Sequence, residues 1–142
     1  MLTDTLVTGT RTMVFNASAE TITISDDGEA GDDESRIDST AGEQLDFAHP
    51  TNALVIRGDG GDDTIDLDGA GQSSDLADVH VVAAAASGSD LNVFGTGGEE
   101  TFHVTPTSDG AGGFHEADNG PSATYIGFDG GAVTYHGGPG VD

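Results

Sequence analysis

A strand–turn–strand unit that recurs along the sequence constrains this chain more than any other feature. Residues 54–67 read LVIRGDGGDDTIDL, and residues 91–104 read LNVFGTGGEETFHV. They align without a gap as an apolar run, Gly-x-Gly-Gly-acid-acid-Thr, and a second apolar run. A third copy begins at 133–142, and a degenerate copy spans 22–33. Units that recur at tens of residues are typical of repeat proteins, in which each unit packs on its neighbours.

Apolar residues alternate with polar ones in short runs around these turns, as in Ile22 and Ile24 or Ile65 and Leu67. This period of two indicates β-strands with one buried face and one solvated face. Helix signals are weak throughout the chain. We expect the following residues to be buried: Ile22, Ile24, Phe47, Ile56, Ile65, Leu67, Val79, Val81, Leu91, Val93, Phe102, Val104, Val133 and Tyr135.

The repeat and the alternation together predict an all-β fold, a right-handed parallel β-solenoid with Gly/Asp-rich turns near 28–33, 58–66, 95–103 and 137–142. Residues 1–142 are expected to form a single domain. Because the third copy stops in the middle of its motif, we expect the chain to be a fragment of a longer repeat array. An antiparallel β-sandwich is the alternative, since it also contains short alternating strands.

The turns resemble the calcium-binding nonapeptide of RTX (hemolysin-type) proteins, G-G-x-G-x-D-x-U-x, in which U is a large apolar residue. The segment that starts at Gly58 matches this pattern at Gly58, Gly61, Asp63 and Ile65, and it departs from it at Asp59. The chain is also similar to long repetitive bacterial surface proteins that are secreted and form parallel β-helices.

The second copy is a poorer match to the same nonapeptide. It matches at Gly95, Gly98 and Phe102, and it departs at Thr96 and at Glu100, where the pattern has Asp. The third copy matches at every position that it reaches. The motifs cover about a quarter of the chain.

The resemblance implies that calcium is the cofactor. Calcium prefers six to eight oxygen ligands, and glycines allow a turn to direct several carbonyls at one point. Ordinary turn chemistry also explains Gly/Asp clusters between strands. The residues implicated in metal binding are Gly58, Asp59, Gly61, Asp63, Asp66, Gly95, Gly98, Glu100, Gly137, Gly140 and Asp142, with Gly28, Gly31 and Asp33 of the degenerate copy.

The charge of the chain excludes several kinds of partner. Its net charge is -23, and its only basic residues besides histidine are Arg11, Arg36 and Arg57. Nucleic acid and anionic membrane surfaces need a basic face, so neither is expected as a partner. Self-repulsion of this size disfavours a compact state unless cations gather on it. There is no cysteine, no apolar stretch long enough for membrane insertion, and no signal peptide, so an export signal is expected outside this sequence.

These observations predict a calcium-binding structural or adhesive module of a secreted or cell-surface protein. The alternative is a metal-independent subunit of a filament or surface layer, which self-associates through the ends of its solenoid. A polysaccharide-active β-helix is a third reading. We expect no enzymatic activity, because adjacent carboxylates on a strand point to opposite faces, and Asp66 and Asp68, which share a face, lack a partnering base or cation. We expect His80, His103 and His136 to be solvated strand residues.

Overall fold

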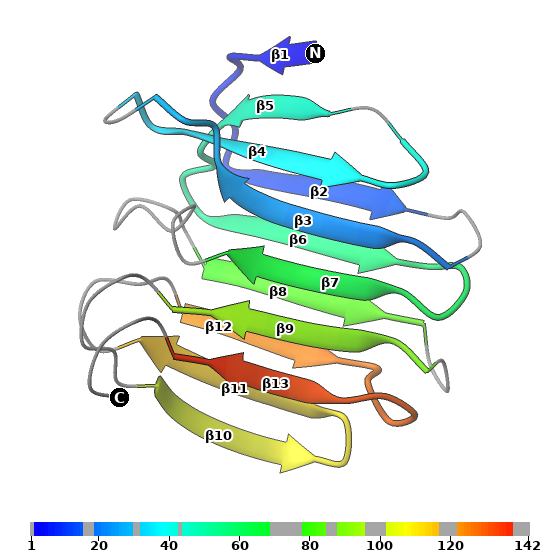
Figure 1. Ribbon diagram of the computed structural model, residues 1–142. Helices are drawn as coiled ribbons and strands as arrows, with labels where there is room; N and C mark the ends of the chain where they lie inside the picture. The colour runs from blue at the N-terminus through cyan, green and yellow to red at the C-terminus, as the bar shows by residue number, and fades with distance from the viewer. Residues whose placement is uncertain are drawn as a thin grey trace.

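The computed structural model describes residues 2–15, 19–29, 32–42, 44–68, 78–84, 88–95, 102–116 and 122–137. These residues form thirteen β-strands and no helix, arranged in two mixed sheets, neither of which is closed (Figure 1). The all-β prediction is confirmed. Accordingly, the described part of the chain contains no helix long and apolar enough to cross a membrane.

Each sheet is built from strands that are distant in the sequence. The seven-stranded sheet has the spatial order β1 (Leu2–Asp4), β5 (Leu45–Ala48), β4 (Glu34–Ser39), β3 (Thr21–Asp26), β7 (Thr64–Asp68), β9 (Asp90–Phe94) and β13 (Val133–His136). The six-stranded sheet has the order β10 (Phe102–Ser108), β11 (Ala111–Glu116), β12 (Ser122–Ile126), β8 (Asp78–Ala83), β6 (Ala53–Gly58) and β2 (Thr10–Phe15).

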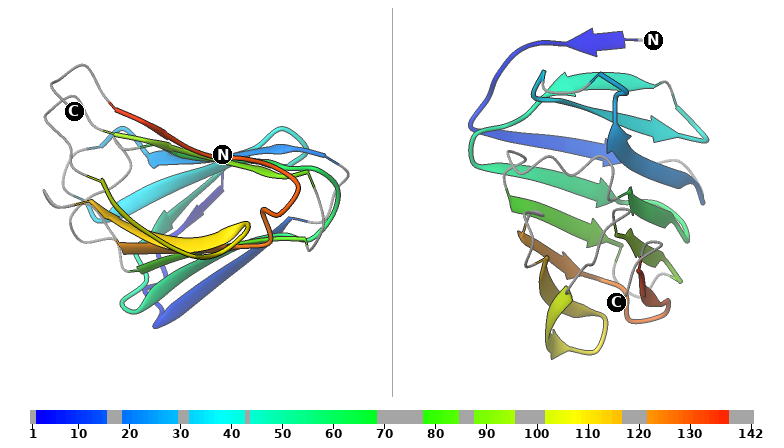
Figure 2. Two further views of the ribbon diagram at one scale, coloured as in Figure 1. Left: turned by 90° about the horizontal axis from the view of Figure 1, so that it is seen from below. Right: turned by 60° about the vertical axis from the view of Figure 1, so that its left-hand side comes forward.

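Four two-strand units form the body of the molecule. In each unit the chain runs along a strand of the six-stranded sheet and then along a strand of the seven-stranded sheet. The units are β2–β3, β6–β7, β8–β9 and β12–β13. Successive units pair in parallel in both sheets. Figure 2 shows the two sheets as facing layers.

Two hairpins interrupt this succession. β4 and β5 continue the seven-stranded sheet beyond β3, and β10 and β11 continue the six-stranded sheet beyond β12. Each sheet therefore extends past the other at one end of the molecule. Short connections join strands in antiparallel fashion, whereas parallel pairing needs a longer crossover. The result is seven parallel and four antiparallel pairs, which matches neither a purely parallel arrangement nor a purely antiparallel sandwich.

The core consists of apolar rows that run across the strands. In the seven-stranded sheet, Ile22, Ile65, Leu91 and Val133 are register partners in turn. A second row of the same sheet contains Ile24, Leu67, Val93 and Tyr135. The facing row of the six-stranded sheet contains Met13, Ile56, Val81 and Tyr125. Because every unit places an apolar residue at the same inward position, stacking the units produces one continuous core.

Burial was predicted well by the alternation of apolar and polar residues. Ten expected core residues are buried: Ile22, Ile24, Phe47, Ile56, Ile65, Leu67, Val79, Val81, Leu91 and Val93. Val133 and Tyr135 are partly buried, and the side chain of Phe102 lies outside the described residues. The prediction that Val104 is buried is wrong: Val104 is 42% exposed. It lies on β10, an edge strand that extends past β13, and no strand of the described residues lies opposite it.

The two aligned copies of the sequence repeat do not stack on each other. Leu54 begins the first copy on β6, in the six-stranded sheet, whereas Leu91 begins the second copy on β9, in the seven-stranded sheet. A chain that alternates between two facing sheets must turn in both directions. The first copy leads from the six-stranded to the seven-stranded sheet, and the second copy leads back. The sequence repeat identifies the strand–turn–strand unit correctly but not which strands become neighbours.

Replacing Ile65 with alanine tests the importance of the rows. Ile65 is fully buried between its partners Ile22 and Leu91, so Ile65→Ala should lower the free energy of unfolding by about 2–5 kcal/mol in urea denaturation. The exposed control Val104→Ala should cost about 0.5 kcal/mol or less. Equal losses at the two positions would contradict this description of the core.

Candidate functional site

The β6–β7 turn carries four of the residues implicated in calcium binding. Gly58 is buried at the end of β6, and Gly61 adopts a φ of 89°, a conformation that favours glycine. The side chain of Asp59 points to solvent and forms a salt bridge of 3.0 Å with Arg57. Asp63, in contrast, is turned into the protein, and its side chain is almost completely buried at 1% exposure.

Asp63 connects three successive units of the stack. Its carboxylate Oδ1 accepts a hydrogen bond of 3.1 Å from the backbone N–H of Glu20, which precedes β3. Its own N–H donates to the Ser89 hydroxyl at 3.0 Å, and its carbonyl accepts from the N–H of Asp90 at 2.7 Å. Glu20, Asp63 and Ser89 precede the paired strands β3, β7 and β9 at equivalent positions. The Asp63 side chain thus replaces a missing backbone acceptor between neighbouring turns.

Gly58 provides the space that the buried carboxylate occupies. A Cβ atom added at Gly58 would lie 2.4 Å from Oδ2 of Asp63. Within the described residues, this buried Oδ2 atom has no hydrogen-bond partner. Glycine at the first position of the motif is therefore required by the side chain of Asp63 as well as by turn geometry.

Electrostatics disfavour the ionised form of Asp63. Burial raises the pKa of Asp63, and the nearby charges of Glu20 and Asp62 act in the same direction, whereas the hydrogen bond from Glu20 N–H opposes them. Glu20 is itself buried, at 6% exposure, and its carboxylate accepts a hydrogen bond from the Ser39 hydroxyl. Two buried carboxyl groups thus lie close together in the stack of turns.

The other carboxylate of this turn is directed elsewhere. Asp62 Oδ1 accepts a hydrogen bond from Gly88 N–H at 2.8 Å. Together with the Asp59–Arg57 pair, this engages each acidic side chain of the turn separately. Within the described residues, the turn does not bring three carboxylates to one point.

The remaining predicted residues lie away from this turn. Gly95 and Gly137 follow β9 and β13 at the opposite end of the strands, where the N–H of Gly95 donates to the carbonyl of His136 at 2.8 Å. Asp66 lies on the outer face of β7, and its Oδ1 accepts from Asn92 Nδ2 at 2.8 Å. Gly31, Gly98, Glu100, Gly140 and Asp142 lie outside the described residues. Of the residues predicted to bind calcium, Gly58 lies against Asp63. Gly95 is hydrogen-bonded to His136, the residue that precedes Gly137.

A group of carboxylates gathers instead at the β3–β4 turn, in the degenerate copy of the repeat. One ligand atom each from Asp27, Asp32 and Glu34 lies within 4.8 Å of the other two, and we call these residues the turn cluster. The predicted residues Gly28, at a φ of 100°, and Asp33, at a φ of 58°, shape the same turn. Among the described residues this is the one group of three such side chains.

Hydrogen bonds hold two of the three carboxylates of the turn cluster in place. Asp27 Oδ1 accepts from the N–H of Glu29 at 2.9 Å, and Asp32 Oδ1 accepts from the N–H of Glu34 at 3.2 Å. Partial removal from water, followed by the charges of Asp32 and Asp27, raises the pKa of Glu34. The cluster is therefore a point of concentrated negative charge.

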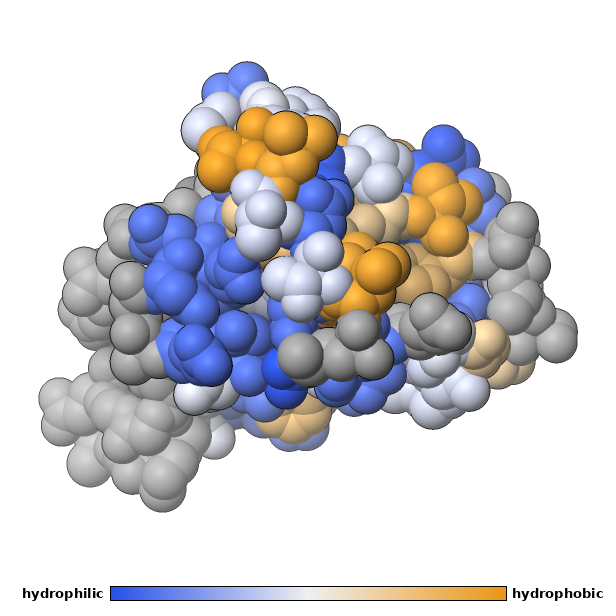
Figure 3. All heavy atoms as spheres, turned by 90° about the horizontal axis from the view of Figure 1, so that it is seen from above, coloured by the Kyte–Doolittle hydropathy of each residue, from blue (hydrophilic) through white to orange (hydrophobic). Residues whose placement is uncertain are grey.

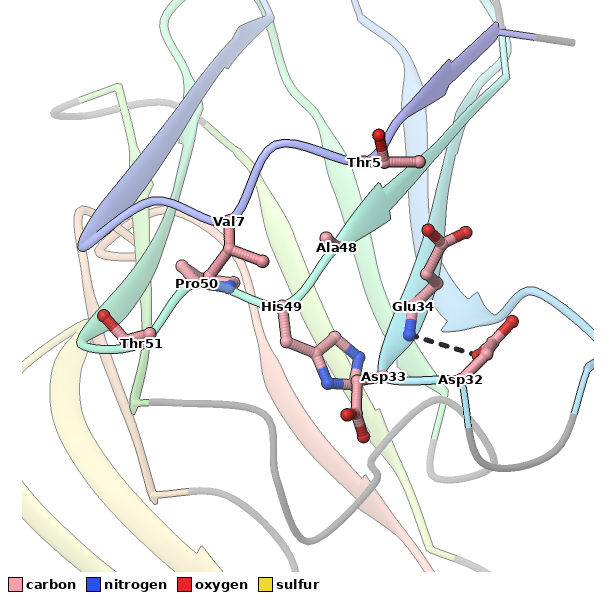
Figure 4. Close-up of a pocket in the computed structure, with 9 residues that line it drawn as sticks. All are labelled: Thr5, Val7, Asp32, Asp33, Glu34, Ala48, His49, Pro50 and Thr51. Carbon is pink, nitrogen blue, oxygen red and sulfur yellow. Dashed lines mark hydrogen bonds between the residues drawn. The ribbon is translucent and has the colours of Figure 1, made fainter.

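A cavity of about 420 Å³ adjoins the turn cluster (Figure 4). Asp32, Asp33, Glu34 and His49 are among the residues that line it, and the backbone N–H of His49 donates to the carbonyl of Asp33 at 2.9 Å. The imidazole Nε2 of His49 lies 2.8 Å from the hydroxyl of Ser35. Ser35 is fully buried, and its contact with His49 links β4 to the end of β5.

The basic side chains of the chain form salt bridges at other places. The pairs are Arg11 with Asp4 at 2.6 Å, Arg36 with Asp46 at 2.6 Å and Arg57 with Asp59 at 3.0 Å. None of these pairs includes a carboxylate of the turn cluster. The hydrogen bond with Asp46 and, to a smaller extent, the charge of Asp27 raise the pKa of Arg36, so Arg36 offsets part of the charge of the cluster. The sequence contains no lysine and no fourth arginine.

Sequence reasoning missed the turn cluster and the salt bridge of Arg36 with the buried Asp46. The acidic run at 26–34 was a signal for the turn cluster, since six of its nine residues are Asp or Glu. Asp46 alternates with Leu45 and Phe47 and therefore looked like a solvated strand residue, yet it is 4% exposed. The hydrogen-bonded guanidinium of Arg36 lowers the pKa of Asp46.

Comparison with known proteins adds no relative from which a function can be inferred: the chain matches no family model, no curated protein and no solved structure.

The buried carboxyl group of Asp63 gives a pH-dependent prediction. A pKa raised above its ordinary value of 3.8 means that the folded protein loses stability as pH rises through the interval between the unfolded and folded values. Asp63→Asn keeps the acceptor for Glu20 N–H but does not ionise. Relative to the wild type, its free energy of unfolding should therefore increase between about pH 3 and pH 7.

Asp63→Ala is the contrasting variant for the same measurement. It removes the acceptor and should destabilise the fold by about 1–3 kcal/mol at neutral pH. Thermal or urea unfolding across this pH range provides both results. A difference between wild type and Asp63→Asn that does not change with pH would contradict the proposed cost of ionising Asp63.

Proposed function

We propose that this chain is a calcium-binding structural or adhesive module of a secreted or cell-surface protein, folded as a right-handed parallel β-solenoid with an inserted hairpin near each end. The observation that carries the calcium proposal is the turn cluster of Asp27, Asp32 and Glu34. Carboxylate oxygens are the ligands that calcium prefers, and weak sites of extracellular modules bind it at about 0.1–1 mM.

Three features support the turn cluster over the β6–β7 turn as the calcium site. The carboxylates of the cluster converge on one another, whereas those of the β6–β7 turn each have a separate partner. The adjoining cavity leaves space for water ligands, which calcium needs to complete its shell. Within the described residues, the salt bridges of Arg11, Arg36 and Arg57 are formed with Asp4, Asp46 and Asp59, which lie outside the cluster.

The solenoid proposal is supported by the in-register stacking of the four two-strand units. Each unit contributes one strand to each sheet, and the inward residues of successive units form continuous rows. Under this proposal, the function of the module is to extend or present other parts of a surface protein, and it carries no catalytic activity.

Calcium should raise the melting temperature of the wild-type protein. A ligand that binds only the folded state stabilises it by about 2.7 kcal/mol at a concentration of one hundred times its Kd, which corresponds to a shift of several degrees. Thermal unfolding is measured between about 0.1 and 10 mM calcium. Sodium chloride of equal ionic strength serves as the control for general screening of charge.

A pair of matched variants assigns this effect to the turn cluster. Asp27→Asn combined with Asp32→Asn removes two charges but retains the acceptors for the turn, and it should abolish most of the calcium-specific shift. Asp109→Asn combined with Asp129→Asn removes two charges from exposed positions at the other end of the molecule and should leave the shift intact. The proposal fails if the wild type shows no shift beyond that of sodium chloride, or if both variants retain it.

Self-assembly without metal is the second candidate function, and exposed apolar side chains favour it. Leu2, Leu6 and Val7 are 58%, 65% and 61% exposed in the N-terminal segment. Figure 3 views this end of the molecule and shows apolar side chains among hydrophilic ones. Sedimentation in the presence of chelator distinguishes the candidates, since this second function requires concentration-dependent oligomers without calcium.

A further inference from the structure

A groove of about 380 Å³ lies on the outer face of the seven-stranded sheet. Asp66 and Asp68 of β7, Phe94 of β9 and His136 of β13 are among the residues that line it. Three parallel strands that are distant in sequence therefore contribute to one concave surface. The proposed calcium site uses none of these residues.

Strand register places the side chains of the groove in two rows. Asp68, Phe94 and His136 are register partners on adjacent strands. Asp66 lies two residues before Asp68, so its side chain points to the same face about 7 Å away. The two carboxylates therefore lie along one side of the groove, and the rings lie beside one of them.

The two rings of the groove form a parallel stack. The rings of Phe94 and His136 have centroids 4.6 Å apart and an interplanar angle of 10°. His136 therefore covers one face of the Phe94 ring. The opposite face is directed toward β7, where Asp68 is the register partner of Phe94.

Asp66 contributes negative charge to the groove. Asp66 Oδ1 accepts its hydrogen bond from the amide of Asn92 at 2.8 Å, and a neutral donor fixes the orientation of a carboxylate without cancelling its charge. The salt bridges of the three arginines involve Asp4, Asp46 and Asp59 instead. The net charge of -23 also draws cations toward the whole surface.

We infer that this groove binds a guanidinium group, presented by an arginine side chain of a basic partner. A guanidinium is planar, donates paired hydrogen bonds to carboxylates and stacks on aromatic faces. The groove offers carboxylates for the hydrogen bonds and the Phe94 face for the stack. A neutral ligand would gain nothing from the charge of the groove, and an anion would be repelled by it.

Titration of the isotopically labelled protein with a blocked Gly-Arg-Gly peptide tests this inference. Backbone NMR shifts are followed at about 0.15 M salt, where exposed charges beyond about 8 Å are screened. Chelator is present throughout, so that the outcome is independent of the calcium proposal. Shifts are expected to concentrate around Asp66, Asp68, Phe94 and His136, and the citrulline analogue, which is neutral, should bind at least tenfold more weakly.

Three variants separate the groove from the general acidic field. Asp66→Asn combined with Asp68→Asn should weaken binding of the arginine peptide about tenfold or more. Phe94→Leu, which keeps an apolar residue, should weaken it about twofold to fivefold. Asp109→Asn combined with Asp129→Asn removes the same charge at the opposite end of β13 and should change the affinity less than about twofold.

The same spectra show whether each variant is folded. Equal losses in the two double variants would overturn the inference, because binding would then depend on net charge alone. The inference would also be overturned by shifts that spread over the acidic surface or by equal binding of the citrulline peptide. The same holds for no binding at about 10 mM peptide, a concentration far above any working affinity.

Discussion

An imbalance of charge is the constraint on which the rest of this structure depends. The chain has 26 acidic residues and three arginines, so folding brings like charges together with few basic partners to offset them. The apolar rows that include Ile22, Ile65 and Leu91 provide the opposing driving force, since stacking the units buries them completely. Strand alternation keeps most carboxylates on the outer faces, where water and dissolved cations screen them.

Three buried carboxylates, Asp46, Glu20 and Asp63, are stabilised in three different ways. Asp46 has an arginine partner in Arg36. Glu20 accepts a hydrogen bond from the Ser39 hydroxyl. Asp63 accepts one from a backbone N–H, and its other oxygen has no partner among the residues that the structure describes. The turn cluster represents a fourth case, in which the compensating charge is proposed to come from calcium. The same charge that disfavours a compact state makes the molecule a receptor for cations.

Local pattern allowed most of the strands and core residues to be predicted, because period-two alternation depends on neighbouring residues alone. Pairing could not be predicted in the same way. The aligned copies at Leu54 and Leu91 proved to begin in different sheets, and alternation within a strand does not show that the hairpins extend each sheet by antiparallel pairing. Asp63 was singled out from its motif, but its structural role depends on Glu20 and Ser89, which are distant in the sequence. The turn cluster likewise depends on how one turn folds.

The most direct test of the calcium proposal is a crystal structure of the protein grown with millimolar calcium. The account predicts an ion bound by Asp27, Asp32 and Glu34, with six to eight oxygen ligands at about 2.3–2.6 Å including waters from the adjoining cavity. Anomalous scattering identifies the ion independently of its ligand distances. A turn cluster without an ion at saturating calcium, in a lattice that leaves it open to solvent, would contradict the account.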